Sequence, residues 1–570
     1  MTNNINRTNG KKIVCALLLT IAAFPLFAEH EFGFAAAPLY DAPLGVKHIQ
    51  GGVGAEASLD WAFLQFPASG ERARQFGAGL AAGGSFSSLA ASAGGPFTLF
   101  SGGAGPFVRW RPFDRWTFRF DTRFGAYGYQ WEEDSGSRMM TNFALGADFH
   151  LSPYISIYGQ GGYTLRPFAD GQPLNSLGIA LGVRLNLSEI MTSRARVQGT
   201  KTEQHRVFPV SFAWYEENPI AVVRITNDEP TAITDISLSF FVDNYMGQPG
   251  DFAVLPSLAS GESSTVPVTA LFNEAMLGLT ENVSANGEVR IQYRSLGAKK
   301  ETVFPLQMPV YHRNAMSWDD DRRAASFVSP RDSAARLFAL RVAAIADKSA
   351  ADKSAADKSA ADKSEASPPQ NVRYAAALFE ALRLYGINYI IDPASSFVEM
   401  SDNASALDTL NYPYQTLNYR GGDCDDLSIL FCSLLEVLGI QTAFITIPGH
   451  IYMAFDSGDD EWAAGNRDII ELEGRRWIPV EITMPAEGFT TAWRVGAREW
   501  RTAYAENAAK TSGDEEPAAR LYPTHESWKL YPPVSVAESS GRLPVLPAEE
   551  QINAALARQQ KNLTAAAQAR

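Results

Sequence analysis

Cysteine is scarce in this chain, which has three among its 570 residues: Cys15, Cys424 and Cys432. Cys424 and Cys432 lie on one predicted helix, and eight residues of helix span roughly 12 Å of rise. That separation is too large for a disulfide between them. Cys15 lies in an N-terminal segment that we expect to be removed, so the sequence predicts a mature protein with two free thiols and no disulfide framework.

Histidine and basic clusters are also rare. The seven histidines are scattered, with no pair at metal-ligand spacing, so we expect no metal and no cofactor. A net charge of −14 without a basic cluster argues against a nucleic-acid partner. The composition, 46% apolar and 20% charged, is typical of folded protein. A chain of 570 residues is expected to form about two to four domains.

The only long apolar run is at the N-terminus. Lys11 and Lys12 precede the run Ile13–Phe27, and Ala28 offers a small residue for cleavage. This pattern is typical of a secretory signal peptide, and the run is short for a membrane span. We therefore predict that residues 1–28 direct export.

The next region, residues 29–190, alternates apolar and polar residues with a period of two. In 116–130, Trp116, Phe118 and Phe120 share one face, and Thr117 and Arg119 lie on the other. This alternation is typical of an outer-membrane-type β-barrel, apolar toward lipid and polar toward the lumen. The predicted strands are eight, near residues 31–40, 51–65, 76–88, 98–110, 116–130, 140–151, 154–165 and 177–187.

An eight-stranded antiparallel barrel has both chain ends on one side, which we expect to be the periplasm. The expected short turns are Arg111–Arg115 and Ser152–Pro153, and the expected long outer loops are Glu132–Met139 and Arg166–Ser176. A barrel of this size fills its own interior, so we expect an anchor rather than a pore. The alternative is a soluble β-sandwich or lipocalin-like barrel with its apolar face inward.

Two further domains are expected. Residues 205–313 contain alternating segments separated by turn-rich loops, which predicts an immunoglobulin-like β-sandwich without catalytic residues. Residues 314–490 form an α+β domain with a low-complexity A-D-K-S-A insert at 346–365. The five-residue period of the insert gives no apolar stripe, so we expect an exposed insert that is either helical or disordered. Residues 491–570 form a C-terminal extension whose role the sequence does not indicate.

The stretch G-G-D-C-D-D-L-S-I-L places Cys424 in the first turn of a predicted core helix. Asp423 is a suitable N-cap, and Gly439 ends the helix. The positive end of the helix dipole favours thiolate over thiol at Cys424. Cys432, two turns further on, is expected to be a small core residue.

A reactive thiol needs a base and a group that orients the base. His450 follows Pro448–Gly449 at the start of a predicted strand, and Glu481 lies on a later strand of a hairpin. We predict that His450 is the base and that Glu481 orients it. Asp456, Glu471 and Glu473 are nearby rivals for the orienting role.

The motifs G-D-C-D-D-L-S-I-L and P-G-H, with the order Cys, His, acid, resemble the transglutaminase-like superfamily, a branch of the papain-like cysteine hydrolases. The resemblance covers roughly 314–483, and it departs from the family at Glu481, where the family usually has Asp. It implies a Cys424–His450–Glu481 triad acting on peptide amide bonds. Gln415 and Tyr419 are candidates to help the Cys424 backbone N–H stabilise an oxyanion.

The sequence thus predicts an outer-membrane-anchored hydrolase or acyltransferase of the bacterial envelope, with its C-terminal domains in the periplasm and a protein or peptide as substrate. Water as acceptor makes it a peptidase or amidase, and an amine makes it a transglutaminase. Hydrolysis is favoured in a water-filled periplasm. The alternatives are an inactive binding or envelope-spacing protein with the same fold, and a soluble secreted enzyme.

Overall fold

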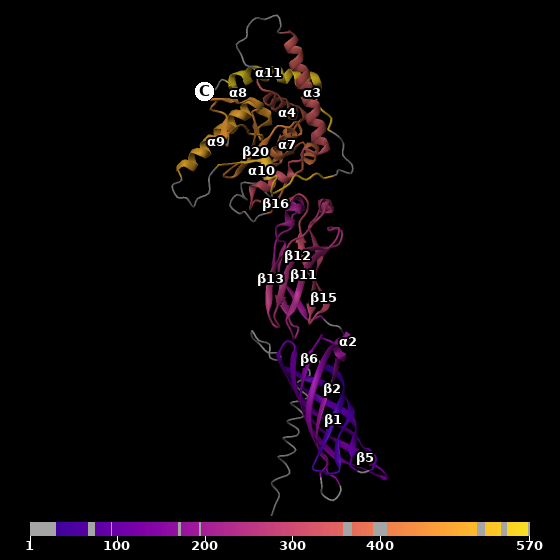
Figure 1. Cartoon of the computed structure of the whole chain (residues 1–570). Coiled ribbons are helices and arrows are strands. Elements are labelled where there is room, and N and C mark those ends of the chain that lie inside the picture. The colour runs from indigo at the N-terminus through magenta and orange to yellow at the C-terminus, as the bar shows by residue number, and fades with distance from the viewer. Residues whose placement is uncertain are drawn as a thin grey trace, which may run out of the picture.

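Three units follow one another along the computed structural model, in chain order from barrel to α+β domain (Figure 1). The structure describes residues 30–66, 75–92, 94–168, 173–192, 195–356, 368–391, 407–472, 474–509, 519–536 and 544–567. The predicted signal peptide, residues 1–28, lies outside the described residues. Among the described residues, no helix has both the length and the apolar character needed to cross a membrane.

The first unit is a closed barrel of eight antiparallel strands, in which β8 pairs with β1. The strands are β1 (Glu31–Leu44), β2 (Ile49–Phe66), β3 (Gln75–Ala91), β4 (Phe97–Phe113), β5 (Trp116–Trp131), β6 (Asp134–His150), β7 (Ile155–Leu165) and β8 (Asn175–Asn186). All eight predicted strands are therefore confirmed, and the soluble sandwich is excluded for this region.

One predicted loop is wrong. Residues 132–139 belong largely to β6, because β5 and β6 stay paired as far as Trp131 and Asp134. Only a two-residue turn remains, in which Glu132 adopts a positive φ of 54°. The polar residues of this segment led to the prediction of a loop. Two paired strands, however, satisfy each other's backbone hydrogen bonds whether their side chains are polar or apolar.

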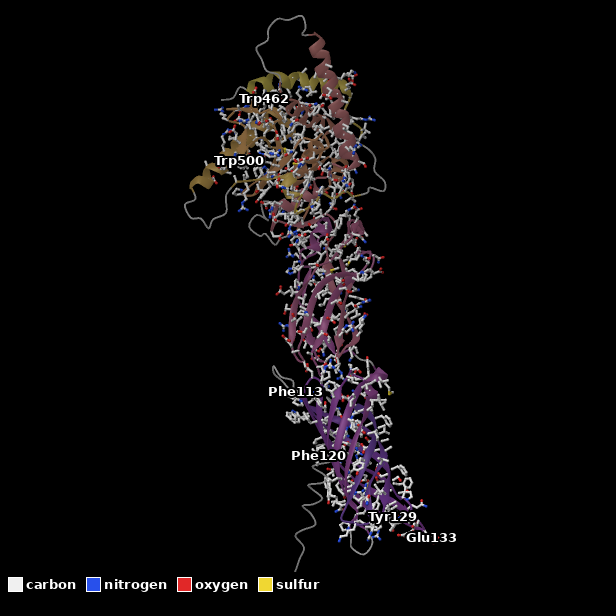
Figure 2. The ribbon with its side chains drawn as sticks, viewed as in Figure 1. Phe113, Phe120, Tyr129, Glu133, Trp462 and Trp500 are labelled. Atoms are coloured by element: carbon white, nitrogen blue, oxygen red, sulfur yellow. The ribbon has the colours of Figure 1, made fainter. Side chains whose placement is uncertain are left out.

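The faces of the barrel follow the predicted alternation. Phe118, Phe120 and Phe124 are exposed on the outside, with Phe120 at 40% exposure, whereas Arg119 and Asp121 are buried inside. Figure 2 shows Phe113 and Phe120 on the outer surface of the barrel. An outward apolar band with a polar interior is the arrangement of outer-membrane-type barrels.

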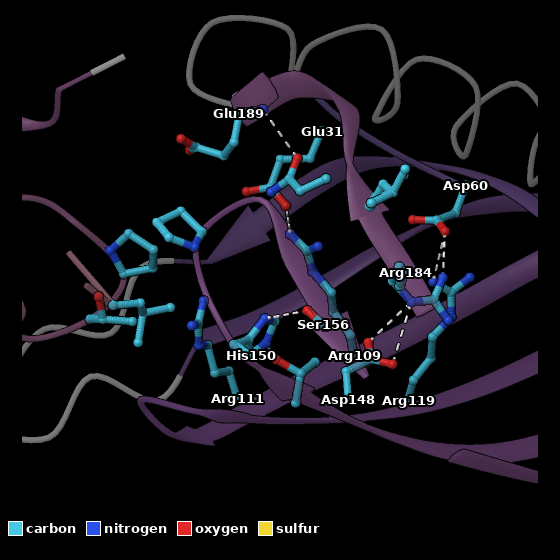
Figure 3. A pocket seen from close by; sticks show the side chains of 18 of the residues that line it. Glu31, Asp60, Arg109, Arg111, Arg119, Asp148, His150, Ser156, Arg184 and Glu189 are labelled. Carbon is cyan, nitrogen blue, oxygen red and sulfur yellow. Dashed lines mark hydrogen bonds and ion pairs between the residues drawn. The ribbon is translucent and has the colours of Figure 1, made fainter. Parts of the chain in front are cut away.

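Paired charges fill the interior. Arg184 contacts Asp60 at 2.6 Å and Asp148 at 3.2 Å, and Arg119 contacts Asp121 at 2.8 Å. In Figure 3, Asp60, Arg119, Asp148 and Arg184 lie together in a pocket whose lining also includes residues 229–231 of the second unit. Such pairing offsets the cost of burying charge, and it occupies the lumen with side chains, as expected for eight strands.

The second unit packs a three-stranded sheet, β13-β10-β9, against a four-stranded sheet, β12-β11-β14-β15, over one apolar core. The strands are β9 (Val197–Gln204), β10 (Ala221–Asn227), β11 (Ile233–Val242), β12 (Gly250–Leu258), β13 (Ser263–Val268), β14 (Val283–Ser295) and β15 (Ala298–Val310), and the 3-10 helices are η2 (Pro209–Glu216) and η3 (Glu274–Gly278). The second unit is therefore a β-sandwich, and its immunoglobulin-like class stays a prediction.

Buried charges join the sandwich to the barrel. Helix α2 (Leu187–Thr192) follows β8 directly and carries Glu189. Lys300 Nζ donates to Glu189 at 3.1 Å and to Glu229 at 3.1 Å, and the Tyr293 hydroxyl donates to Glu229 at 2.7 Å. Lys300 is only 6% exposed. Its buried ammonium group and the two carboxylates therefore depend on one another, and this cluster holds the barrel and the sandwich in one orientation.

The third unit is built around a five-stranded sheet of order β22-β23-β21-β20-β24, with α7 against one face. The sheet strands are β20 (Thr442–Ile447), β21 (His450–Asp456), β22 (Ile470–Leu472), β23 (Arg475–Val480) and β24 (Arg520–Pro523). Short two-stranded pairs are formed by β16 (Ala315–Ser317) with β18 (Leu407–Thr409), and by β17 (Asn388–Tyr389) with β19 (Gly421–Gly422). The helices are η4 (Asp321–Phe327), α3 (Ser333–Ala356), α4 (Gln370–Tyr385), α6 (Pro413–Tyr419), α7 (Cys424–Val437), α8 (Asp460–Ala463), η6 (Pro485–Glu487), α9 (Phe489–Ala509), α10 (Thr524–Ser527) and α11 (Glu549–Ala567).

One expected domain boundary does not separate two units in the structure, and the first part of the insert takes the helical form of the two that were expected. Helix α9 runs across the expected boundary at residue 490, and Trp493 and Ile552 lie in the same core as α7, so the C-terminal extension packs into the third unit. The insert begins as regular helix within α3, where Ala346 is buried and Asp347 accepts from Tyr374 at 2.9 Å. Its later part, residues 357–365, lies outside the described residues.

Candidate active site

The predicted nucleophile lies at the start of the central helix. Cys424 is the first residue of α7, and the Asp423 carboxylate caps the helix by accepting from the Asp426 N–H at 3.4 Å. Leu427, Leu430 and Phe431 are buried and fix the helix against the sheet. Cys424 is 5% exposed. Its N–H is among the helix N–H groups that have no acceptor within the helix, which leaves it available to a ligand.

The predicted base and orienting acid lie on neighbouring strands. His450 is the first residue of β21, after a turn in which Gly449 has a φ of 71°. Glu481 directly follows β23, which pairs with β21. His450 Nε2 and Glu481 Oε2 are 2.7 Å apart. The strand pairing therefore brings together two residues that are thirty-one positions apart.

The Cys424 side chain lies close enough to the same imidazole to favour its charged form. Because Nε2 faces Glu481, Nδ1 is the nitrogen left for the thiol. Burial by itself would lower the pKa of His450, but the interactions with Cys424 and Glu481 raise this pKa to about 10. The imidazole is therefore protonated at neutral pH, between two groups that favour a positive charge.

Glu481 is held from several sides. Its Oε1 accepts from the Thr483 N–H at 3.1 Å and from the Thr483 hydroxyl, and its own N–H donates to the Ala492 carbonyl at 3.0 Å. Burial would raise the pKa of Glu481, yet the hydrogen bond and charge of His450 lower it below its ordinary value. The carboxylate thus stays ionised beside the imidazolium.

The predicted rivals of Glu481 lie elsewhere. Asp456 contacts Arg475 at 3.5 Å at the far end of β21, and Glu471 contacts Arg476 at 2.8 Å on β22. Glu473 lies outside the described residues.

The structure adds two residues that the sequence did not indicate. Tyr389, on β17, lies close enough to Cys424, Asp423 and Glu481 that burial and then their negative charges raise its pKa above the ordinary value. Tyr389 is 40% exposed and lies at the edge of the site. Because its pKa is raised, its hydroxyl is protonated at neutral pH and can donate a hydrogen bond. Glu499, on α9, has a carboxyl oxygen within 4.8 Å of a Glu481 carboxyl oxygen. An acid on the edge of the apolar stripe of α9 was the only available sequence signal.

The two oxyanion candidates lie on α6. Gln415 Oε1 accepts from the Tyr412 N–H at 2.9 Å and from Asn314 Nδ2 at 2.8 Å, so only its Nε2 group is left to donate to a ligand. Tyr419 is 64% exposed. The interactions of the described residues link neither side chain to Cys424, and their oxyanion role stays a prediction.

Three acids surround the start of α7. Asp426 accepts from the Asn411 N–H and from Asn411 Nδ2, both at 2.6 Å, which ties the chain before α6 to the helix. Burial and the charge of Asp423 raise the pKa of Asp426 to about 7. Burial and a hydrogen bond with Asp423 raise the pKa of Asp425 well above its ordinary value. Burial and the neighbouring charges therefore favour the protonated forms of Asp425 and Asp426.

Two groups of residues have ligand-type atoms within 4.8 Å of one another: His450 with Glu481 and Glu499, and Asp423 with Asp425 and Asp426. Every carboxylate of these groups except that of Glu499 accepts a hydrogen bond from an N–H group of the described residues. We assign neither group to a metal.

The second thiol, Cys432, is fully buried, and burial raises its pKa. The two thiols therefore differ in surroundings, since only Cys424 has an imidazolium beside it.

No protein-family model matches the chain, and no curated protein matches it. Among solved structures, Neisserial surface protein A is 11% identical, with a TM-score of 0.21, over 28% of this chain and 98% of its own. Ail of Yersinia pestis is 16% identical, with a TM-score of 0.18, over 28% of this chain and 100% of its own. The β domain of the Bordetella autotransporter BrkA is 8% identical, with a TM-score of 0.19, over 49% of this chain and 92% of its own. The assignment of the first unit as a closed eight-stranded barrel rests on the pairing of its strands and not on these similarities.

Proposed function

We propose that this protein is a transglutaminase-like thiol enzyme, anchored in the bacterial outer membrane, that cleaves or transfers peptide amide bonds. The observation that carries the proposal is the connected row from Cys424 through His450 to Glu481. A thiol at a helix start, a protonated imidazole and a buried carboxylate in this order form the constellation of nucleophilic acyl transfer.

The first step forms a thioester. The Cys424 thiolate attacks the carbonyl carbon of the amide, and the C=O electron pair moves to oxygen. The Cys424 N–H and the positive end of α7 stabilise that oxyanion. His450 gives its Nδ1 proton to the leaving nitrogen as the C–N bond breaks. Glu481 keeps the ring in place and stabilises its positive charge.

The second step releases the acyl group. Water or an amine loses a proton to neutral His450 and attacks the thioester carbonyl, and the Cys424 thiolate leaves. Water gives a carboxylic acid, and an amine gives a new amide. His450 is again an imidazolium and the thiolate is restored, so both outcomes use the same residues.

The barrel supports the envelope part of the proposal. Its outward face carries exposed aromatic and aliphatic side chains, and its buried charges lie inside. The chain enters and leaves the barrel at the end that carries the sandwich (Figure 1). With this end in the periplasm, the enzyme domain works on periplasmic peptides, at a distance from the membrane set by the sandwich.

The test offers the full-length protein a mixture of peptides together with a biotin-labelled primary amine. Mass spectrometry then scores new peptide termini, which report hydrolysis, and biotinylated peptides, which report transfer. Cys424→Ser is expected to abolish both signals, and the matched Cys432→Ser variant is expected to retain them. Equal signals from the unaltered protein and Cys424→Ser would refute the enzymatic proposal.

The alternative is a non-catalytic spacer of the envelope. The buried ion cluster of Glu189, Glu229 and Lys300 favours it, because a fixed barrel–sandwich junction suits a rigid stalk. The same experiment separates the two functions, since a spacer gives neither peptide signal.

A further inference from the structure

Helix α9 approaches the end of β23 unusually closely. A Cβ atom at Gly496 would lie 3.1 Å from the Glu481 nitrogen and 3.3 Å from the carbonyl carbon of Pro479. A Cβ atom at this position would make tighter contacts than most Cβ atoms do, so glycine favours this approach. The Tyr452 hydroxyl donates to the Gly496 carbonyl at 3.1 Å, and the Glu481 N–H donates to the Ala492 carbonyl at 3.0 Å. These two bonds dock the helix on the residue that orients His450.

Glu499 lies three residues beyond Gly496 on this helix. Its Oε2 atom is buried, and no N–H or O–H of the described residues donates to it. A Glu499 carboxyl oxygen instead lies within 4.8 Å of a Glu481 carboxyl oxygen. Two ionised carboxylates are both acceptors and repel each other at this distance, so the contact favours a proton on one of them. Glu481 faces the imidazolium and stays ionised, which puts the proton on Glu499.

We propose that Glu499 is a positioning residue of the active site, which donates a hydrogen bond as a neutral carboxylic acid and holds Glu481 against His450. The inference rests on the proposed function. It also explains how Glu serves in place of the Asp that the resemblance implies. The longer side chain has one more rotatable bond, and a donor on α9 restricts it.

The surroundings of Glu499 support a neutral acid. Burial first, and then the hydrogen bond and charge of Glu481, raise the pKa of Glu499 to about 7. The charges of His450, on β21, and of Arg498, on α9, act in the opposite direction, and Tyr452 is the other titratable group that feels its charge. Glu499 is therefore expected to lose its proton, and with it the bond, as the pH rises through about 7.

The test compares Glu499→Gln, which keeps a donor but cannot ionise, with Glu499→Ala, which removes it. Glu506→Ala, on the exposed side of the same helix, is the matched control. The full-length protein is alkylated with iodoacetamide between pH 5.5 and 8.5, and mass spectrometry follows the Cys424 peptide. In parallel, exchange of the imidazole C2 proton reports the titration midpoint of His450 without any need for a reactive thiol.

At pH 5.5, we expect the Cys424 alkylation rate of Glu499→Gln to stay within about twofold of that of the unaltered protein. The rate of Glu499→Ala should be about tenfold lower, which is the factor expected for the loss of one hydrogen bond to a charged group. The Cys424 alkylation rate of the unaltered protein, divided by the rate of Glu499→Gln at the same pH, should fall as the pH rises through about 7. Glu499→Ala should also lower the His450 midpoint, and Glu506→Ala should change nothing.

Two results would overturn the inference: Glu499→Ala leaving the His450 midpoint unchanged, or Glu499→Gln behaving like Glu499→Ala at every pH. A Cys424 that reacts no faster than a free thiol refutes the proposed function instead. The His450 midpoint then still decides the role of Glu499.

Discussion

Replacing His450 with Ala should slow alkylation of Cys424 about thirtyfold. The rise in the pKa of His450 from 6.5 to about 10 corresponds to about 5 kcal/mol of interaction that favours its charged form. The interactions with Cys424 and Glu481 provide it. Coupling is reciprocal, so the imidazolium beside Cys424 also favours its reaction. If about half of this interaction belongs to Cys424, losing it costs about 2 kcal/mol, or about thirtyfold in the alkylation rate.

The assay is alkylation by iodoacetamide at about pH 6.5, where the thiolate is the reacting species. Cys432 serves as the internal control because it is fully buried and should react only after unfolding. His525→Ala is the matched variant, since His525 Nε2 lies 2.8 Å from Glu436 Oε2 in a similar His–Glu pair far from Cys424 in the chain. It should leave the Cys424 rate unchanged.

Glu481→Gln should slow the same reaction less than His450→Ala does, because the imidazole remains but loses its carboxylate. Equal Cys424 rates in the unaltered protein and His450→Ala, with Cys432 unreactive in both, would refute the ion-pair reasoning. A reactive Cys432 would instead report unfolding of the variant.

Three further predictions follow from individual contacts. Gly496→Ala puts a Cβ 3.1 Å from the Glu481 nitrogen, so it should displace α9 and slow Cys424 alkylation severalfold; a rate equal to that of the unaltered protein would contradict the close-approach argument. The raised pKa of Asp425 makes folding take up a proton, so stability falls as the pH rises above about 4 toward the raised pKa. Asp425→Asn removes this loss, and it should raise the thermal unfolding temperature followed by circular dichroism by a few degrees at pH 8 but not at pH 4. Glu133→Cys lies at the barrel turn far from the sandwich (Figure 2), and it should react with an impermeant reagent in intact cells. Gln248→Cys lies on the sandwich and should not react. Labelling of Gln248→Cys while the outer membrane is sealed would show that the topology is reversed.

The parts of the fold that the sequence predicted well are those with local signals. Each barrel strand carries its own alternation, so the positions of all eight could be read without knowing their partners. The hairpin at residues 132–139 could not, because its strand character comes from pairing between β5 and β6 rather than from apolar residues. The same holds for α9, which packs into the α7 core although nothing in its own sequence marks it as part of that domain.

In the candidate site, the helix and strand signals placed Cys424 and His450 at element starts, where the structure has them. The choice of Glu481 over Asp456 and Glu471 was harder, because it depends on the register between β21 and β23. Glu499 and Tyr389 could not be predicted at all. Each reaches the site through a non-local approach, one across a helix–strand contact at Gly496 and the other through the short pairing of β17 with β19.

A glutamate in the orienting position accounts for the number of contacts that hold the acid. A Glu side chain loses more rotamer freedom than Asp when it is fixed, and that loss opposes a precise contact with His450. Thr483 holds one oxygen, His450 holds the other, and α9 holds the backbone N–H through Ala492 and the carboxyl through Glu499. These contacts share one carboxylate, so their energies are not additive, and losing one weakens the others. The orienting acid is therefore better regarded as a unit of Glu481, Thr483 and Glu499 on two elements than as a single residue.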